Sequence, residues 1–94
     1  MDERIKADIT ARVRAIVADE LSVDEATVVD GARLADDLGG DSLDLVSLTQ
    51  RLDEAFGTNT DDIDLSTLRT FGDVVRLVEK QLAESGDATA GLKA

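Results

Sequence analysis

The sequence has no histidine, cysteine or proline, and its two phenylalanines are the only aromatic residues. Without His or Cys, the chain lacks the central groups of catalytic triads, cysteine nucleophiles and the usual zinc sites. We therefore expect neither a hydrolase nor a metal site. The absence of Cys also means that folding does not depend on disulfides, which is compatible with a reducing cytoplasm.

The second deficit is in positive charge, because the 94 residues carry a formal net charge of −11. That charge repels nucleic acid and anionic membrane surfaces, so we expect partners with basic patches. No apolar run approaches the ~20 residues needed to span a bilayer, and residues 1–6 lack the apolar core of a signal peptide. The sequence therefore predicts a cytoplasmic monomer that binds no nucleic acid and does not insert into membranes.

The spacing of the apolar residues predicts an all-α protein with a single core. A first helix is expected from about residue 3 to residue 20. Its apolar stripe consists of Ile5, Ile9, Val13, Ile16 and Val17. A long loop should follow over residues 21–40, with Ser22 or Asp24 opening a short turn. The side chains that pin this loop to the core are Val23, Val28, Val29, Leu34 and Leu38.

A second helix is predicted to begin at Asp41 or Ser42, either of which suits an N-terminal cap, and to stop at Gly57. On a helical wheel its core-facing residues all lie within about 60° of Leu45. They are Leu45, Leu48, Thr49, Leu52 and Phe56. A brief third helix is expected within residues 58–69. The last helix should start after a Thr70–Asp73 capping box, and we expect it to end near Glu84 and be followed by a disordered tail over residues 85–94.

The segment around Ser42 is where we look for chemistry. The pair Gly39-Gly40 delivers this serine to the first turn of a helix, although a serine in that place is usually just a cap. On the wheel, Leu43 lies about 160° from Leu45, opposite the core stripe, and Val46 lies on its flank. Large apolar side chains facing solvent beside an available hydroxyl are typical of a docking surface.

Acidic residues gather around the same serine. Between Asp36 and Asp64 there are nine acids and one base, Arg51, which accounts for eight of the eleven net negative charges. An acidic run is often only a solubilising surface. Its concentration here favours electrostatic steering of basic partners.

Asp41-Ser42-Leu43, preceded by Leu38-Gly39-Gly40 and followed by Asp44 and Val46, resembles the phosphopantetheine attachment motif of acyl carrier proteins. The resemblance covers about residues 3–84, which would form the acyl carrier domain. It implies a four-helix bundle with three main helices, one short helix and a long first loop. It also implies a carrier without catalytic activity, to which a phosphopantetheinyl transferase attaches phosphopantetheine from coenzyme A at Ser42.

The resemblance further implies roles for individual residues. The phosphopantetheine site would comprise Ser42, Asp41 and Leu43. The surface that meets loading ligases, synthases and other enzymes with basic docking patches would comprise Leu43, Asp44, Val46, Asp53 and Glu54. The wall that shelters an acyl chain would comprise Leu45, Leu48, Thr49, Leu52 and Phe56, although an ordinary core would show the same residues.

Departures from the family pattern leave the pathway open. Fatty-acid carriers often have an acid at the position of Ser47, a docking Met at that of Gln50, and Ile-Pro where this chain has Thr60-Asp61. The double glycine resembles peptidyl carriers. We therefore expect a carrier for acyl groups of fatty acid, polyketide or lipopeptide type. The alternatives are a discrete peptidyl or aminoacyl carrier and, in a different class, an acidic helical adaptor that binds partners without covalent modification.

Overall fold

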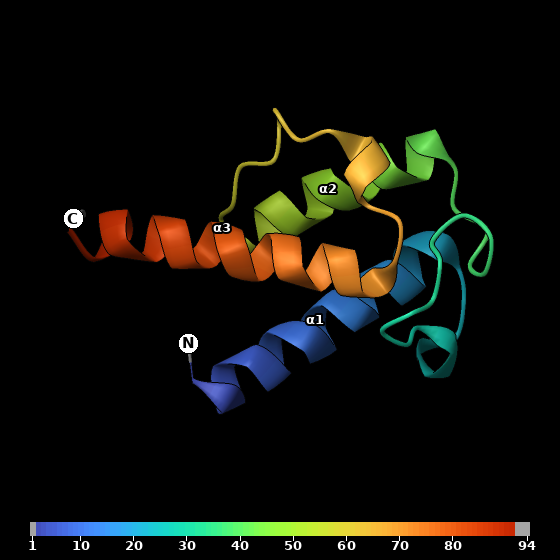
Figure 1. The fold of residues 1–94 in the computed structure, drawn as a ribbon, viewed down its shortest axis with the longest axis horizontal. Helices are drawn as coiled ribbons and strands as arrows, with labels where there is room; N and C mark the ends of the chain where they lie inside the picture. The colour runs from blue at the N-terminus through green and yellow to red at the C-terminus, as the bar shows by residue number, and fades with distance from the viewer. Residues whose placement is uncertain (1, 92–94) are drawn as a thin grey trace.

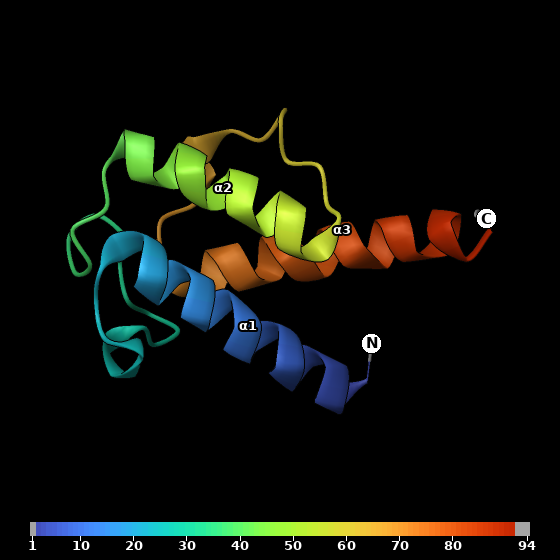
Figure 2. The same ribbon diagram turned by 180° about the vertical axis from the view of Figure 1, so that it is seen from behind.

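The computed structural model describes the backbone of residues 2–91 and the side chains of residues 2–84. Three helices account for most of this range, and the described backbone contains no strand. They are α1 (Glu3–Leu21), α2 (Ser42–Phe56) and α3 (Phe71–Gly91). Figures 1 and 2 show α2 and α3 side by side, with α1 crossing below them. The predicted all-α fold is confirmed, and none of the described helices is long and apolar enough to cross a membrane.

Helix α1 packs its C-terminal two thirds against the other helices. Ile9, Val13 and Val17 are buried, as the apolar stripe predicts. Ile5 is an exception, because its side chain is 51% exposed. The N-terminal turns of α1 splay away from α3 (Figure 1), so Ile5 extends past the core to which its periodicity would assign it.

The long loop between α1 and α2 is held by both side chains and backbone. Val28, Leu34 and Leu38 are buried and Val23 is partly buried, as expected, but Val29 is 56% exposed. The chain turns tightly at Val28, where the N–H of Val29 donates to the carbonyl of Thr27 at 3.1 Å, so Val28 faces the core while Val29 faces solvent. A short 3-10 turn, η1 (Glu25–Thr27), follows Asp24, where a short turn was predicted.

The same loop pairs with the chain that leads into α3. The N–H of Leu34 donates to the carbonyl of Arg69 at 2.9 Å, and the N–H of Phe71 donates to the carbonyl of Ala32 at 2.9 Å. Residues 33 and 70 thus form an isolated antiparallel bridge. The segments that enter α2 and α3 are therefore fixed to each other by backbone hydrogen bonds, which burial makes costly to break.

The link between α2 and α3 contains the brief helical element that was expected within residues 58–69. It is a single 3-10 turn, η2 (Leu65–Thr67). Asp64 accepts hydrogen bonds from both the N–H and the hydroxyl of Ser66 at its start. So short a polar segment gains little from helical hydrogen bonds and stays irregular.

Helix α3 starts at the predicted capping box but continues further than predicted. Asp73 accepts from the N–H of Thr70 at 3.0 Å, and the hydroxyl of Thr70 accepts from the N–H of Asp73 at 3.2 Å. The predicted end near Glu84 is wrong, because α3 runs to Gly91 through residues 85–91, where we expected disorder. The segment has two alanines, which favour a helix, and two glycines, which do not, and no proline interrupts it. The rest of the predicted tail, residues 92–94, lies outside the described residues.

The capping box at the start of α3 makes the stability of the fold depend on pH. Partial burial alone would raise the pKa of Asp73, but hydrogen bonds from the N–H groups of Thr70 and Arg69 and from Arg76 outweigh it and lower the pKa. A carboxylate with a lowered pKa in the fold stabilises it above the unfolded pKa, near 4, and loses that contribution as the pH falls through the folded pKa.

We expect Asp73→Asn to lower the free energy of unfolding by about 1 kcal/mol near pH 7, and the difference from wild type to shrink below about pH 4. Urea denaturation at both pH values measures this. Asp62→Asn is the matched control, since it removes the same charge from an exposed side chain. A deficit that stays constant from pH 7 to pH 3 would contradict the assignment.

Candidate functional site

Ser42 is the first residue of α2, but it is not the cap. Asp41 is the N-cap, and its carboxylate accepts from the N–H of Asp44 at 2.9 Å. The carboxylate of Asp44 accepts in return from the N–H of Asp41 at 3.1 Å. Ser42 is exposed, and its hydroxyl has no hydrogen-bond partner among the described residues. The usual structural role of a serine at a helix start is therefore filled by its neighbours, and the hydroxyl remains available for chemistry.

The double glycine before Ser42 is a fixed turn rather than a flexible one. Gly39 has φ +75°, a left-handed conformation that side chains disfavour. Gly40 is buried, and its N–H donates to the carbonyl of Leu34 at 2.7 Å. A Cβ on Gly40 would lie 3.1 Å from that carbonyl oxygen and 3.1 Å from Cδ2 of Leu21. Gly39 is thus favoured by its backbone conformation, and Gly40 is favoured because there is little space for a side chain. Together they set the position of Ser42.

Gly40→Ala should therefore destabilise the protein by about 1–3 kcal/mol, because the added methyl group meets backbone that cannot move aside freely. Thermal or urea unfolding measures the loss. Gly31→Ala provides the control, since a Cβ there meets nothing within 4 Å. Equal stability of the two variants would show that residues 39–40 are more pliable than their packing indicates.

The surface beside Ser42 carries the exposed apolar residues that the helical wheel predicts. Leu43 is 77% exposed and Val46 is 40% exposed. Asp44 is partly buried and Glu54 is exposed on the same helix. The resemblance predicts that Leu43, Asp44, Val46 and Glu54 meet partner enzymes, and we call these four residues the docking surface.

Asp53 has a different environment from the rest of the predicted partner-binding set. Its carboxylate accepts from the hydroxyl of Thr58 at 2.7 Å, from the N–H of Thr60 at 3.2 Å, and from the hydroxyl of Thr60. Both threonines are buried. Asp53 therefore anchors the loop after α2. Sequence reasoning missed this cluster, although the replacement of Ile-Pro by Thr60-Asp61 was a signal that the loop is held differently.

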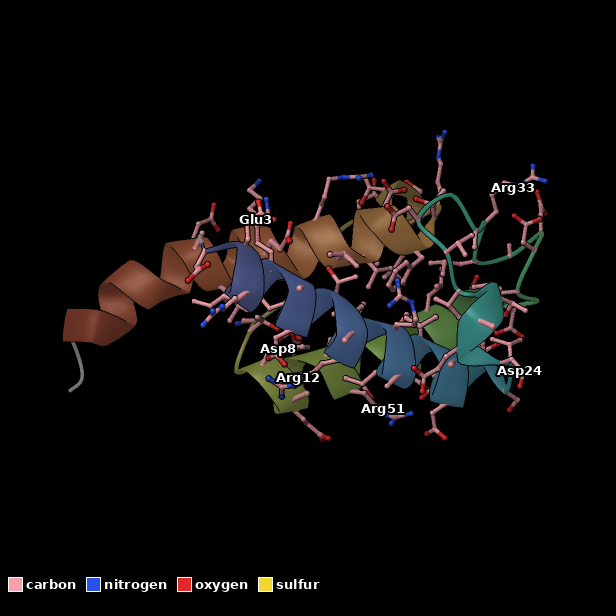
Figure 3. All side chains as sticks on the ribbon, turned by 90° about the horizontal axis from the view of Figure 1, so that it is seen from below. Glu3, Asp8, Arg12, Asp24, Arg33 and Arg51 are labelled. Atoms are coloured by element: carbon pink, nitrogen blue, oxygen red, sulfur yellow. The ribbon has the colours of Figure 1, made fainter. Side chains whose placement is uncertain are left out.

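The single base in the acidic segment is directed away from Ser42. Arg51 donates to Asp19 at 2.8 Å and to Glu20 at 3.2 Å, where α1 and α2 meet (Figure 3). Hydrogen bonds to Glu20 and then to Asp19 raise the pKa of Arg51. Its charge thus compensates acids of α1, and the acids around Ser42 keep their negative field.

The inner face of α2 is partly packed and partly open. Leu48, Thr49 and Leu52 are buried, whereas Leu45 and Phe56 are partly buried. The guanidinium carbon of Arg12 lies over the ring of Phe56, 4.5 Å from the ring centroid. Leu45 lines a pocket of about 310 Å³, and Thr49 lines a separate pocket of about 160 Å³. The role of these five residues as a wall for an acyl chain stays a prediction.

Comparison with known proteins gives a consistent result. Residues 11–78, which include Ser42, match the family model of the phosphopantetheine attachment site. The chain is 44% identical over 77 residues to the acyl carrier protein of Thermotoga maritima, covering 82% of this chain and 95% of the relative. It is also 44% identical over 77 residues to the acyl carrier protein of Sinorhizobium fredii, covering 82% of this chain and 99% of the relative. The chain belongs to the acyl carrier protein family, whose cofactor is phosphopantetheine.

Proposed function

We propose that this protein is a cytoplasmic carrier that holds acyl intermediates on a phosphopantetheine arm attached to Ser42 and presents them to biosynthetic enzymes. The observation that carries the proposal is the free, exposed hydroxyl of Ser42 within the matched phosphopantetheine attachment domain. When bound, the arm supplies a thiol that holds the acyl group as a thioester. This accounts for thioester chemistry in a chain that has no cysteine.

The surroundings of Ser42 suit a phosphodiester. The hydroxyl oxygen would displace adenosine bisphosphate from coenzyme A, so that one P–O bond forms, the pyrophosphate bond breaks, and the hydroxyl proton passes to a base of the transferase. The attachment point lies in the first turn of α2, where the helix dipole favours negative charge. The capping box holds Asp41 and Asp44 with their carboxylates turned to backbone N–H groups. Their charges are thus partly compensated before a phosphate arrives.

The docking surface supports a transient encounter with basic partners. Leu43 supplies a large exposed apolar contact, and the acids around it supply long-range attraction to transferases, loading ligases and synthases. Asp53 would contribute charge to this surface without leaving the loop that it anchors. The carrier itself positions the cargo and catalyses no step.

An acyl cargo is better supported than an aminoacyl one. The double glycine is the feature that resembles peptidyl carriers. Close packing around Gly40 explains the glycine at that position without reference to the cargo. The relatives that cover most of the chain are named acyl carrier proteins. We therefore place the cargo among the acyl groups of fatty acid, polyketide or lipopeptide synthesis.

The test is intact-protein mass spectrometry after incubation with coenzyme A and a broad-specificity phosphopantetheinyl transferase. We expect a gain of one phosphopantetheine unit. Trypsin should release residues 34–51 as one peptide that contains both Ser42 and Ser47, so fragmentation of that peptide assigns the site against an internal control. No gain for a folded sample, with a transferase active on another carrier, would favour the noncovalent adaptor.

A further inference from the structure

A small apolar pocket lies one helical turn beyond Ser42. It has a volume of about 310 Å³, at the lower end of the range for ligand sites. Its apolar lining comes from three separate segments of the chain: Leu34, Ala35, Leu45, Leu65 and Leu68. Leu45 is partly buried and follows Ser42 by three residues, so the pocket is close to the attachment point.

Two arginines line the same pocket and are held there by the backbone. Arg33 and Arg69 belong to the two segments that the isolated bridge joins. The carbonyl of Arg69 accepts a hydrogen bond from the N–H of Leu34, and the N–H of Arg69 donates to the carboxylate of Asp73 at 3.0 Å. The backbone of each arginine is therefore held in place by the fold, while both side chains remain exposed.

These two positive charges are only weakly compensated. Arg33 lies 3.5 Å from both Asp36 and Asp37, and these are long pairs between exposed side chains, which contribute little. Arg69 forms no ion pair with any described residue. Asp36 is the only acid in the lining, and it already faces Arg33. The pocket thus has an apolar floor and, at its rim, one arginine, Arg69, that has no acidic partner among the described residues, on a protein of net charge −11.

We propose that this pocket holds a short acyl group that ends in a carboxylate, with the hydrocarbon chain against Leu45 and Leu68 and the carboxylate paired with Arg69 and Arg33. The inference rests on the proposed attachment at Ser42. Elsewhere near Ser42 the acids would repel a terminal carboxylate. Arginine suits this role because its planar guanidinium can bind a carboxylate through two parallel hydrogen bonds. The cargo class is therefore the half-thioesters of dicarboxylic acids, rather than plain fatty acyl groups of the same length.

The experiment compares two cargoes with the same number of carbon atoms. The transferase loads the protein from glutaryl-coenzyme A or from pentanoyl-coenzyme A, and intact mass spectrometry follows cleavage of each thioester by hydroxylamine. Each rate is divided by the rate for the corresponding coenzyme A thioester, which removes the intrinsic reactivity of the acyl group. We expect the glutaryl form to be protected at least about threefold more than the pentanoyl form.

Arg69→Gln should abolish this difference, because it removes the unpaired guanidinium and leaves the apolar floor. Lys80→Gln is the matched control, since it makes the same charge change at an exposed base that does not line this pocket. It should keep the preference. Equal protection of the two cargoes in the wild type would overturn the proposal. So would an equal effect of Arg69→Gln on both cargoes, which would assign Arg69 to the phosphate of the arm instead.

The failure of this inference is distinguishable from failure of the proposed function. If Ser42 carries no arm, neither coenzyme A thioester adds mass. If the arm is attached but the pocket does not select carboxylates, both loaded masses appear and the normalised cleavage rates agree.

Discussion

Ser42→Ala should abolish phosphopantetheine attachment completely while leaving the fold intact. The reaction consumes the hydroxyl oxygen, which alanine does not provide. The hydroxyl has no hydrogen-bond partner among the described residues, and the capping is done by Asp41 and Asp44. We expect the free energy of unfolding to change by no more than about 0.5 kcal/mol, since alanine is the best helix former and nothing buried is lost.

Intact mass after incubation with coenzyme A and the transferase measures the first effect, and urea denaturation measures the second. Ser47→Ala is the matched control, because it removes a hydroxyl from the same helix and should accept the full phosphopantetheine unit. A variant lacking Ser42 that still gains the unit would move the attachment point to another hydroxyl. A variant that unfolds would show that Ser42 has a structural role that its environment does not reveal.

Phe71→Ala should have the largest effect on stability, a loss of about 3–5 kcal/mol. Phe71 is the largest fully buried side chain among those described, and it begins α3. The guanidinium of Arg14 lies 5.2 Å from its ring centroid and also donates to the carbonyl of Val28. Truncation would therefore open a cavity where α1, the long loop and α3 meet. Because small domains are stable by only about 5–15 kcal/mol, much of the total would be lost.

Urea denaturation measures the loss against two controls. Val29→Ala removes methyl groups from a side chain that is 56% exposed and should change the free energy of unfolding by no more than about 0.5 kcal/mol. Phe56→Ala removes a ring that is only partly buried, so its cost should lie between the other two. If Phe56→Ala cost more than Phe71→Ala, the centre of the core would lie nearer the C-terminal end of α2.

Local signals predicted the local geometry around Ser42 well because it is built from interactions between residues close in sequence. The start of α2 depends on a side chain that caps N–H groups three residues away, and its end depends on the left-handed Gly57. Leu43 is exposed because the helix period places it opposite Leu48 and Leu52, which are buried. These features depend on residues within about one or two helical turns, so the sequence carries them directly.

Features that depend on tertiary position could not be predicted in the same way. Periodicity gives the face of a helix but not where its partner ends, which is why Ile5 is exposed. The turn chemistry of Gly40 is visible in sequence, but its contact with Leu21 is not. The interaction of Asp53 with Thr60 likewise requires a loop that folds back onto α2. Periodicity alone therefore does not reveal that Asp53 anchors this loop.

The bridge between residues 33 and 70 has a consequence for synthesis of the chain. Contacts between residues so far apart in sequence form only after both segments are available, and a nascent chain emerges N-terminal end first. Ser42 therefore leaves the ribosome well before the segment that holds its loop in place. The backbone pairs made by Leu34 and Phe71 close only once the start of α3 has emerged. The surface around Ser42 is thus completed only after the start of α3 has been synthesised, so an enzyme that recognises this folded surface acts after that point of translation.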